Sequence, residues 1–201
     1  MTLNNFLFFF LIVYNLQVSF FLPINNKNRK LFSEIQLTEI GKFGLIRKAR
    51  KTVPSHIHTG IDIKRPNKNY INEPVFAISQ GEVISKRTDG PYAQLIIEHE
   101  INKKKFWTVY EHIAGITVNL HDIVSPEKPI ARFMNKNELN KFGWQFDHFH
   151  LEILKTTPIT IQPDKLHPDR HYNSFSLICF NSDDLEKHYY DPIEFLKEHM
   201  H

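Results

Sequence analysis

The sequence predicts an all-β domain, mainly an antiparallel β sandwich or open barrel, with a short C-terminal helix and an N-terminal apolar segment. Short runs rich in β-branched and aromatic residues indicate the strands. These runs are Val75–Ile78, Gly81–Ser85, Gln94–His99, Phe106–Tyr110 and His148–Leu154. Turn-forming residues separate them, for example Pro66-Asn67 and Asn102-Lys103. Several short strands at close spacing are typical of an antiparallel β domain.

Helical patterns are scarce in this chain. Lys136–Lys141 is long enough for one or two helical turns. Pro192–His199 is predicted to form a C-terminal helix, because Asp191 can cap its N-terminus and Pro192 suits the first helical position.

An uncharged apolar run, Phe6–Tyr14, lies near the N-terminus. Its length suits the hydrophobic region of a signal peptide, whereas a membrane-spanning helix needs about 20 apolar residues. We therefore expect residues 1–22 to be a signal peptide or N-terminal anchor, and the protein to be exported to the periplasm or cell envelope. If residues 6–22 are retained they would anchor the chain, and a buried N-terminal strand is the third alternative. Pro23–Lys30 is polar and basic, so residues 23–42 are expected to form a linker or N-terminal extension.

Composition limits the classes of function. The 201 residues allow one domain of ordinary size, and 41% hydrophobic residues suffice for a core. A formal net charge of +3, without a basic run interleaved with aromatics, gives no indication of nucleic-acid binding. Cys179 is the only cysteine, which excludes an intramolecular disulfide, and we assign it no role.

Two histidines stand two residues apart in the predicted strand 148–154. A strand places alternate residues on one face, so Phe149 and Leu151 share the core face while His148, His150 and Glu152 share the other. Two neutral imidazoles on that face could reach one metal ion or one reacting atom. The alternative is a half-buried strand with two surface histidines.

Two further motifs carry ionisable groups. In His58-Thr59-Gly60-Ile61-Asp62, a turn or bulge at Gly60 would bring His58 back toward Asp62, an arrangement that suits zinc; otherwise Asp62 is merely solvated. In Phe106–His112, alternation places Tyr110 and His112 on the same face. Catalytic zinc sites use three protein ligands and leave the fourth position to water. The motifs supply that number and leave two histidines for proton transfer.

The order His-x-x-x-Asp, Tyr-x-His and His-x-His-x-Glu-Ile resembles the lysostaphin-type zinc endopeptidases, which cleave peptide cross-links in bacterial peptidoglycan. The resemblance runs from about Phe43 to Leu196. It implies a peptidase domain at residues 43–201 that binds one Zn²⁺ per chain and no organic cofactor. By motif position, it implies that His58, Asp62 and His150 are the metal ligands.

The resemblance also implies the chemistry. A metal-activated water would attack the scissile amide, and His112 and His148 would be the catalytic histidines, one of them the general base. The expected substrate is a stem peptide of peptidoglycan. No nucleic acid is expected as a partner, and the membrane only through an uncleaved N-terminal segment. A glycine bridge is the less favoured substrate, because such bridges are restricted to some walls.

The chain departs from the family pattern in its turns. Gly90–Ala93 replaces a glycine-rich turn, and His121–Lys128 lacks two glycines that the family usually has. Lys155–Tyr190 is an insertion that we expect to cover or lengthen one wall of the groove. Such changes leave a second hypothesis, a non-hydrolytic cell-wall-binding regulator or activator on the same scaffold. A third is a β-rich carbohydrate-binding or structural module, which would bind no metal.

Overall fold

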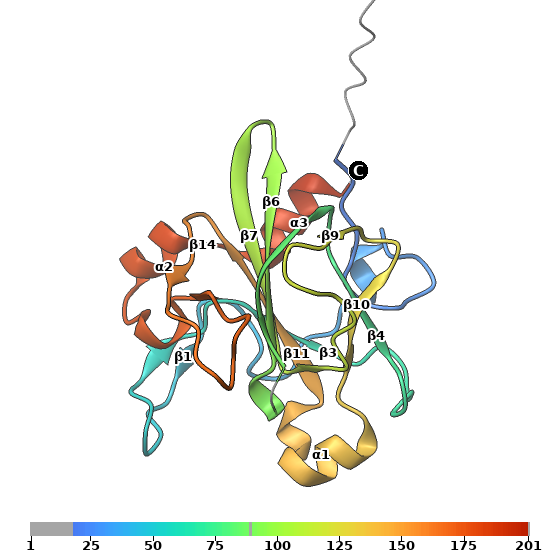
Figure 1. Cartoon of the computed structure of the whole chain (residues 1–201), viewed down its shortest axis with the longest axis horizontal. Helices are drawn as coiled ribbons and strands as arrows, with labels where there is room; N and C mark the ends of the chain where they lie inside the picture. Colours follow the sequence, from blue (N-terminus) through green and yellow to red (C-terminus); the bar gives the residue numbers. More distant parts are fainter. Residues whose placement is uncertain (1–17, 89, 201) are drawn as a thin grey trace, which may run out of the picture.

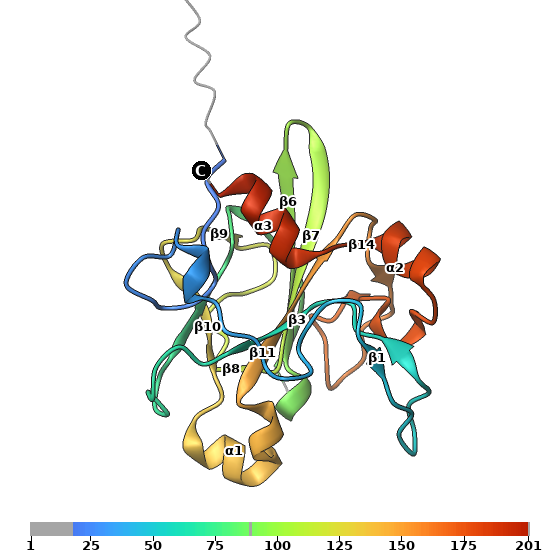
Figure 2. The same ribbon diagram turned by 180° about the vertical axis from the view of Figure 1, so that it is seen from behind.

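The computed structural model describes residues 18–88 and 90–200, and it confirms the predicted fold class (Figures 1 and 2). The main sheet has seven strands in the order β14-β11-β7-β6-β5-β9, with β3 also paired to β11. Their bounds are β3 Ile61–Lys64, β5 Gly81–Arg87, β6 Gln94–Ile101, β7 Lys104–Glu111, β9 Ile123–Val124, β11 His148–Leu154 and β14 Tyr189–Tyr190. The pairings between these strands are antiparallel.

A second, three-stranded sheet has the order β4-β10-β8. Its strands are β4 Pro74–Phe76, β8 Ile113–Ala114 and β10 Pro129–Phe133. Two small hairpins complete the strands: β1 Ile46–Arg47 with β2 His56–Ile57, and β12 Ile159–Thr160 with β13 Tyr172–Asn173. The helices are α1 Lys136–Phe142, α2 Ser182–His188 and α3 Pro192–His199, with 3₁₀ turns η1 Phe32–Glu34, η2 Gly90–Tyr92, η3 Trp144–Phe146 and η4 Ser176–Ile178.

The main core lies between the two sheets. On β11 the side chains of Phe149, Leu151 and Ile153 are fully buried, and Phe149 packs edge-on against Phe133 of β10. The alternation of β11 therefore turns His148, His150 and Glu152 to the opposite face of the main sheet. The sequence predicted this division correctly because its apolar period is two residues.

The insertion packs on that opposite face. A second apolar cluster joins Trp107, Val109 and Leu154 of the sheet to Cys179, Leu185 and other residues of the 155–190 segment. The insertion thus covers the part of the face beyond Glu152, as Figure 1 shows for α2 and its neighbouring loops. Helix α2 was not predicted, because it is short and buries a single apolar side chain, that of Leu185.

The two predicted helices are present. α1 starts with a capping box, in which the side chain of Asn135 accepts from the Glu138 amide and the Glu138 carboxylate accepts from the Asn135 amide. In α3 the Asp191 carboxylate accepts from the Ile193 amide, and Pro192 occupies the first turn, as expected.

The segment expected to be a linker or N-terminal extension packs against the domain. Phe20, Leu22 and Ile24 alternate along an extended segment and are buried in the main core. Ile24 pairs with Val75 of β4, and the Phe21 amide donates to the Ile78 carbonyl at 2.8 Å. The basic residues that suggested a linker include Arg29, whose guanidinium lies 4.0 Å from the Phe76 ring centroid and donates to the Leu22 carbonyl.

The expected signal peptide or anchor lies mostly outside the described residues, which begin at Val18. Phe20, Leu22 and Ile24, which follow the apolar run, are buried in the domain. Within residues 18–88 and 90–200, no helix has the length and apolar character needed to cross a membrane.

Replacing Leu22 by alanine tests whether residues 20–24 contribute to the stability of the domain. Leu22 is fully buried, so Leu22→Ala should lower the free energy of unfolding by about 2–5 kcal/mol in a denaturant titration. Leu31 of the same segment is 49% exposed, and Leu31→Ala is the matched control with an expected change below about 0.5 kcal/mol. Equal, small effects of both substitutions would show that residues 20–24 contribute nothing to the domain.

Candidate metal centre

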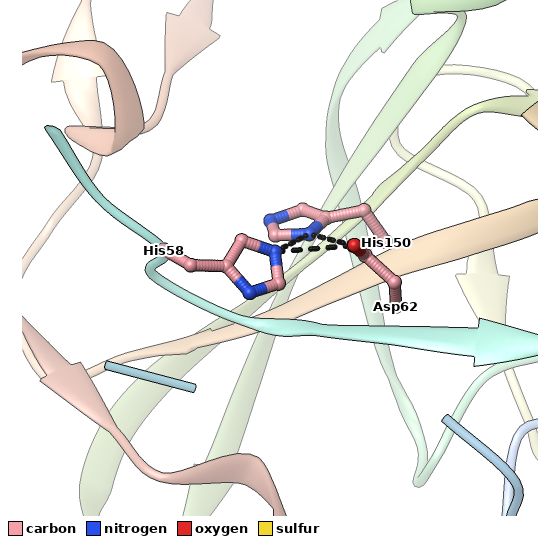
Figure 3. A group of neighbouring side chains, drawn as sticks. All are labelled: His58, Asp62 and His150. Atoms are coloured by element: carbon pink, nitrogen blue, oxygen red, sulfur yellow. Dashed lines mark hydrogen bonds and ion pairs between the residues drawn. The ribbon is translucent and has the colours of Figure 1, made fainter. Parts of the chain in front are cut away.

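The pairing of β3 with β11 builds the centre. Asp62 lies directly opposite His150 in the register of the two antiparallel strands. His58 precedes β3, and a bend at Gly60 brings its ring to the same place (Figure 3). A Cβ on Gly60 would lie 2.2 Å from the Leu151 carbonyl oxygen and 2.8 Å from the His150 ring, so this bend requires glycine for the close approach.

Three ligand atoms converge from these residues. Oδ1 of Asp62 lies 3.1 Å from Nε2 of His58 and 2.9 Å from Nδ1 of His150, and the two nitrogens are 3.0 Å apart. All three side chains are buried, and their ligand atoms lie within 4.8 Å of one another. The predicted convergence of His58 and Asp62 is therefore present, and His150 joins them.

The outer ring nitrogens determine which tautomers face the centre. Nδ1 of His58 lies 2.8 Å from the Lys42 carbonyl oxygen, which can only accept, so this nitrogen carries the proton. Nε2 of His150 lies 3.1 Å from Oε1 of Glu152, and it likewise donates to that carboxylate. In the neutral form of each ring the inner nitrogen is therefore unprotonated, and in that form two nitrogen lone pairs meet a carboxylate oxygen at one point. Such a donor set fits a zinc ion.

The charges agree with a cation site. Burial alone raises the pKa of the Asp62 carboxyl, but hydrogen bonds from His150 and His58 outweigh it and hold this pKa well below its usual range. Burial lowers the pKa of His150, whereas the Asp62 and Glu152 carboxylates together raise it to about 10. Burial is the main reason that the pKa of His58 is lowered. Without metal, the Asp62 and Glu152 carboxylates thus favour the protonated, positively charged form of His150.

Arg47 restricts how Asp62 can bind a metal. Its Nη2 atom donates to Oδ2 of Asp62 at 2.6 Å from hairpin β1–β2. Because Oδ2 is occupied, Asp62 offers a metal its Oδ1 atom alone. Arg47 also compensates the buried carboxylate, so the cluster has one neutralised acid and two imidazoles.

His148 lies at the open edge of the cluster. Its Nε2 atom is 3.8 Å from Oδ1 of Asp62, too far for a hydrogen bond. Burial lowers the pKa of His148 to about 4, which leaves the ring neutral near pH 7. His148 therefore lies beside the cluster of His58, Asp62 and His150 without a hydrogen bond to Asp62, whereas His150 is hydrogen-bonded to Asp62.

His112 reaches the site by a route that alternation did not predict. The sequence placed His112 on the same face as Tyr110, which stacks against Phe149 in the core. His112 instead has a φ of 62°, a left-handed conformation that breaks the pleat at the end of β7. Its ring therefore turns to the metal face, where its centroid lies 5.2 Å from that of His148.

The partner of His112 also fixes its tautomer. Nδ1 of His112 donates to the Pro91 carbonyl oxygen at 2.6 Å, which leaves Nε2 unprotonated in the neutral ring. Tyr92 and Phe146 flank the ring. The Tyr92 centroid lies 6.0 Å from that of His112 and 5.9 Å from that of Phe146. The remodelled turn at residues 90–93 therefore supplies the support for His112.

No role was predicted for Glu152, Thr59 or Arg47 from the sequence. Glu152 had a usable signal, because it lies two residues after His150 on the same strand face. Thr59 donates to the same Glu152 oxygen at 2.5 Å. Arg47 had no signal, since a hairpin brings it to Asp62. His56, two residues before His58, hydrogen-bonds the Pro54 carbonyl oxygen through Nδ1 at 2.9 Å.

The family of the chain follows from its sequence match. Residues 56–163, more than half of the chain, match the model of peptidase family M23. This span contains the three clustered residues and both additional histidines. The chain therefore belongs to peptidase family M23, the lysostaphin-type peptidases that its motifs resemble. No curated protein matches the chain.

The solved structures to which this chain is similar have low sequence identity to it. Lysostaphin from Staphylococcus simulans is 19% identical over 85% of this chain and 53% of that chain, with a TM-score of 0.49. A zinc-containing peptidase from Vibrio cholerae is 26% identical over 67% of this chain and 36% of that chain, with a TM-score of 0.47. A structure of the SpoIIIAH and SpoIIQ complex gives 19% identity over 69% of this chain and 92% of that chain, with a TM-score of 0.45. The match thus spans about a third of the Vibrio chain and about half of lysostaphin.

Glu152 provides a test of the tautomer argument. In Glu152→Ala the His150 ring loses the acceptor that holds its Nδ1 lone pair toward the centre. We expect zinc affinity, measured by competition with a chelating dye, to fall about 10- to 100-fold. Glu152→Gln keeps an acceptor and should lose less, and the exposed Glu100→Gln is the control that should lose nothing. Unchanged zinc affinity in Glu152→Ala, with the fold intact by circular dichroism, would contradict the assigned contact.

Proposed function

We propose that this protein is a zinc metalloendopeptidase that hydrolyses peptide cross-links of bacterial peptidoglycan. The convergence of two histidine lone pairs and one carboxylate oxygen at a single buried point carries this proposal. Membership of peptidase family M23 supports it. In this proposal His58, Asp62 and His150 hold one Zn²⁺ ion per chain.

A zinc ion in this site would supply a Lewis acid and lower the pKa of a bound water. His148 and His112 line the side of the site that the ligands leave open. One of them accepts a proton as general base, and whichever ring carries a proton on its substrate-facing nitrogen donates a hydrogen bond to the oxyanion that develops on the substrate carbonyl. Nδ1 of His112 donates to the Pro91 carbonyl, so the Nε2 lone pair of this ring is available to accept a proton.

Export completes the proposal, because the substrate lies outside the cytoplasm. It is supported by the apolar run Phe6–Tyr14 in the sequence. Burial of Phe20 and Leu22 adds a limit, since removal of residues 1–22 would take both side chains out of the core. A processing site compatible with the fold therefore precedes Phe20.

Two substitutions separate ligation from proton transfer. Asp62→Ala removes a ligand and should abolish stoichiometric zinc binding, measured by elemental analysis of the purified protein. His148→Ala should retain one equivalent of zinc and reduce turnover of purified peptidoglycan by about 100-fold or more, because its assigned role is proton transfer.

The same measurements distinguish the remaining hypotheses. Stoichiometric zinc in the unsubstituted protein without hydrolysis of any peptidoglycan would indicate the non-hydrolytic regulator. Absence of bound zinc would contradict the peptidase and the regulator alike.

A further inference from the structure

A groove runs from the metal centre along β3. It has a volume of about 830 Å³ and begins at Asp62 and His148. Its walls are residues 38–40, the segment from β3 to Tyr70, and the residues of η3 and its C-terminal flank. The groove is thus continuous with the side of the centre that the cluster residues leave open.

Lys64 places a positive charge at the start of this groove. It lies two residues after Asp62 on β3 and directly opposite His148 in the register, so its side chain shares the face of the metal centre. Lys68 follows in the same wall, and both side chains belong to exposed residues. Among the described residues, no carboxylate forms an ion pair with either lysine.

The other charges of the groove are mostly compensated. Arg65 is structural: its Nε donates to Asp147 at 2.8 Å, and its Nη atoms donate to the Asn69 and Met134 carbonyls. Asp62 is paired with Arg47. Glu39 is the one lining carboxylate outside these pairs, so the two lysines leave the groove with a net positive charge before any metal binds.

Aromatic side chains form the far wall. The rings of Tyr70 and Trp144 meet edge to face with centroids 5.7 Å apart, and Trp144 is 49% exposed. The indole N–H of Trp144 donates to Asn140 at 3.0 Å, and the Arg65 guanidinium lies over the Tyr70 ring at 4.7 Å. Rings held in this way offer an apolar surface to the side chains of an extended peptide.

From this arrangement we infer that the groove binds an acidic stem peptide, and that Lys64 and Lys68 pair with its free carboxylates. The inference rests on the proposed function, since it names the class of substrate for the same centre. An uncharged bridge such as oligoglycine would leave both lysines without partners and would present no side chains to Tyr70 and Trp144. The two lysines are therefore specificity-determining residues.

The test compares two synthetic cross-linked stem peptides that differ only in charge, one with free side carboxylates and one with these groups amidated. The full chain loaded with zinc should show a kcat/KM for the free-acid peptide that is higher by roughly 2- to 30-fold, the range that two exposed ion pairs give. This ratio should shrink at high salt, because exposed charges are screened. The double variant Lys64→Gln, Lys68→Gln should bring the ratio to about one.

Lys104→Gln is the matched control. Lys104 is an exposed lysine in the β6–β7 hairpin, which projects away from the α1 end of the molecule (Figure 1). It should keep the full preference. Equal kcat/KM for both peptides, or an unchanged preference in the double variant, would overturn the groove inference and leave the proposed peptidase activity intact.

Failure of the proposed function gives a different result. If neither peptide is cleaved by the zinc-loaded protein, the peptidase proposal is contradicted for these substrates. The groove is then tested by titration calorimetry of both peptides on the same protein. Tighter binding of the free-acid peptide that is lost in the double variant supports the groove inference, and equal or absent binding overturns it.

Discussion

Antiparallel pairing of β3 with β11 is the constraint on which the site depends. Ile61 and Ile63 on one strand and Phe149 and Leu151 on the other are fully buried on the same face. A slip of one residue in either strand would turn these side chains out and turn ionisable groups into the core. Burial of apolar side chains therefore fixes Asp62 opposite His150 and Lys64 opposite His148, and hydrophobic energy sets the geometry of a polar centre.

The centre has one closed and one open side. On the closed side, the Lys42 carbonyl and the Glu152 carboxylate fix the imidazole tautomers, and the inserted segment covers the sheet beyond Glu152. On the open side, His148 leads into the groove with Lys64. In the proposed function, the metal ligands lie on the buried side and the substrate contacts lie on the exposed side. The insertion packs on the main sheet, and none of its described residues lines the groove along β3.

Short-range patterns in the sequence predicted much of this arrangement. The spacing of His148 and His150 within an alternating strand gives their common face, and helix α3 follows from the local signals at Asp191 and Pro192. His58 and Asp62 were predicted to converge through Gly60, and they do. The roles of all five residues in catalysis or ligation are proposals that the fold makes geometrically possible.

Long-range contacts and unusual backbone angles could not be predicted. Arg47 meets Asp62 only because a hairpin folds back, and the sequence between them carries no sign of it. His112 faces the centre because of one left-handed residue, which periodicity alone does not reveal. The composition placed a boundary between Leu22 and Pro23, with a signal peptide or anchor before it and a linker or extension after it. The alternate apolar side chains of residues 20–24 nevertheless belong to one segment that is part of the core. The polarity of the following residues obscured that period.

The central claim is that outer hydrogen bonds set two different tautomers around one metal. Nitrogen-15 NMR of the histidine rings in the zinc-loaded full chain measures this directly. The account predicts that His58 binds zinc through Nε2 and retains its Nδ1 proton, while His150 binds through Nδ1 and retains its Nε2 proton. Zinc bound through the same nitrogen in both rings, or to histidines other than these two, would contradict it.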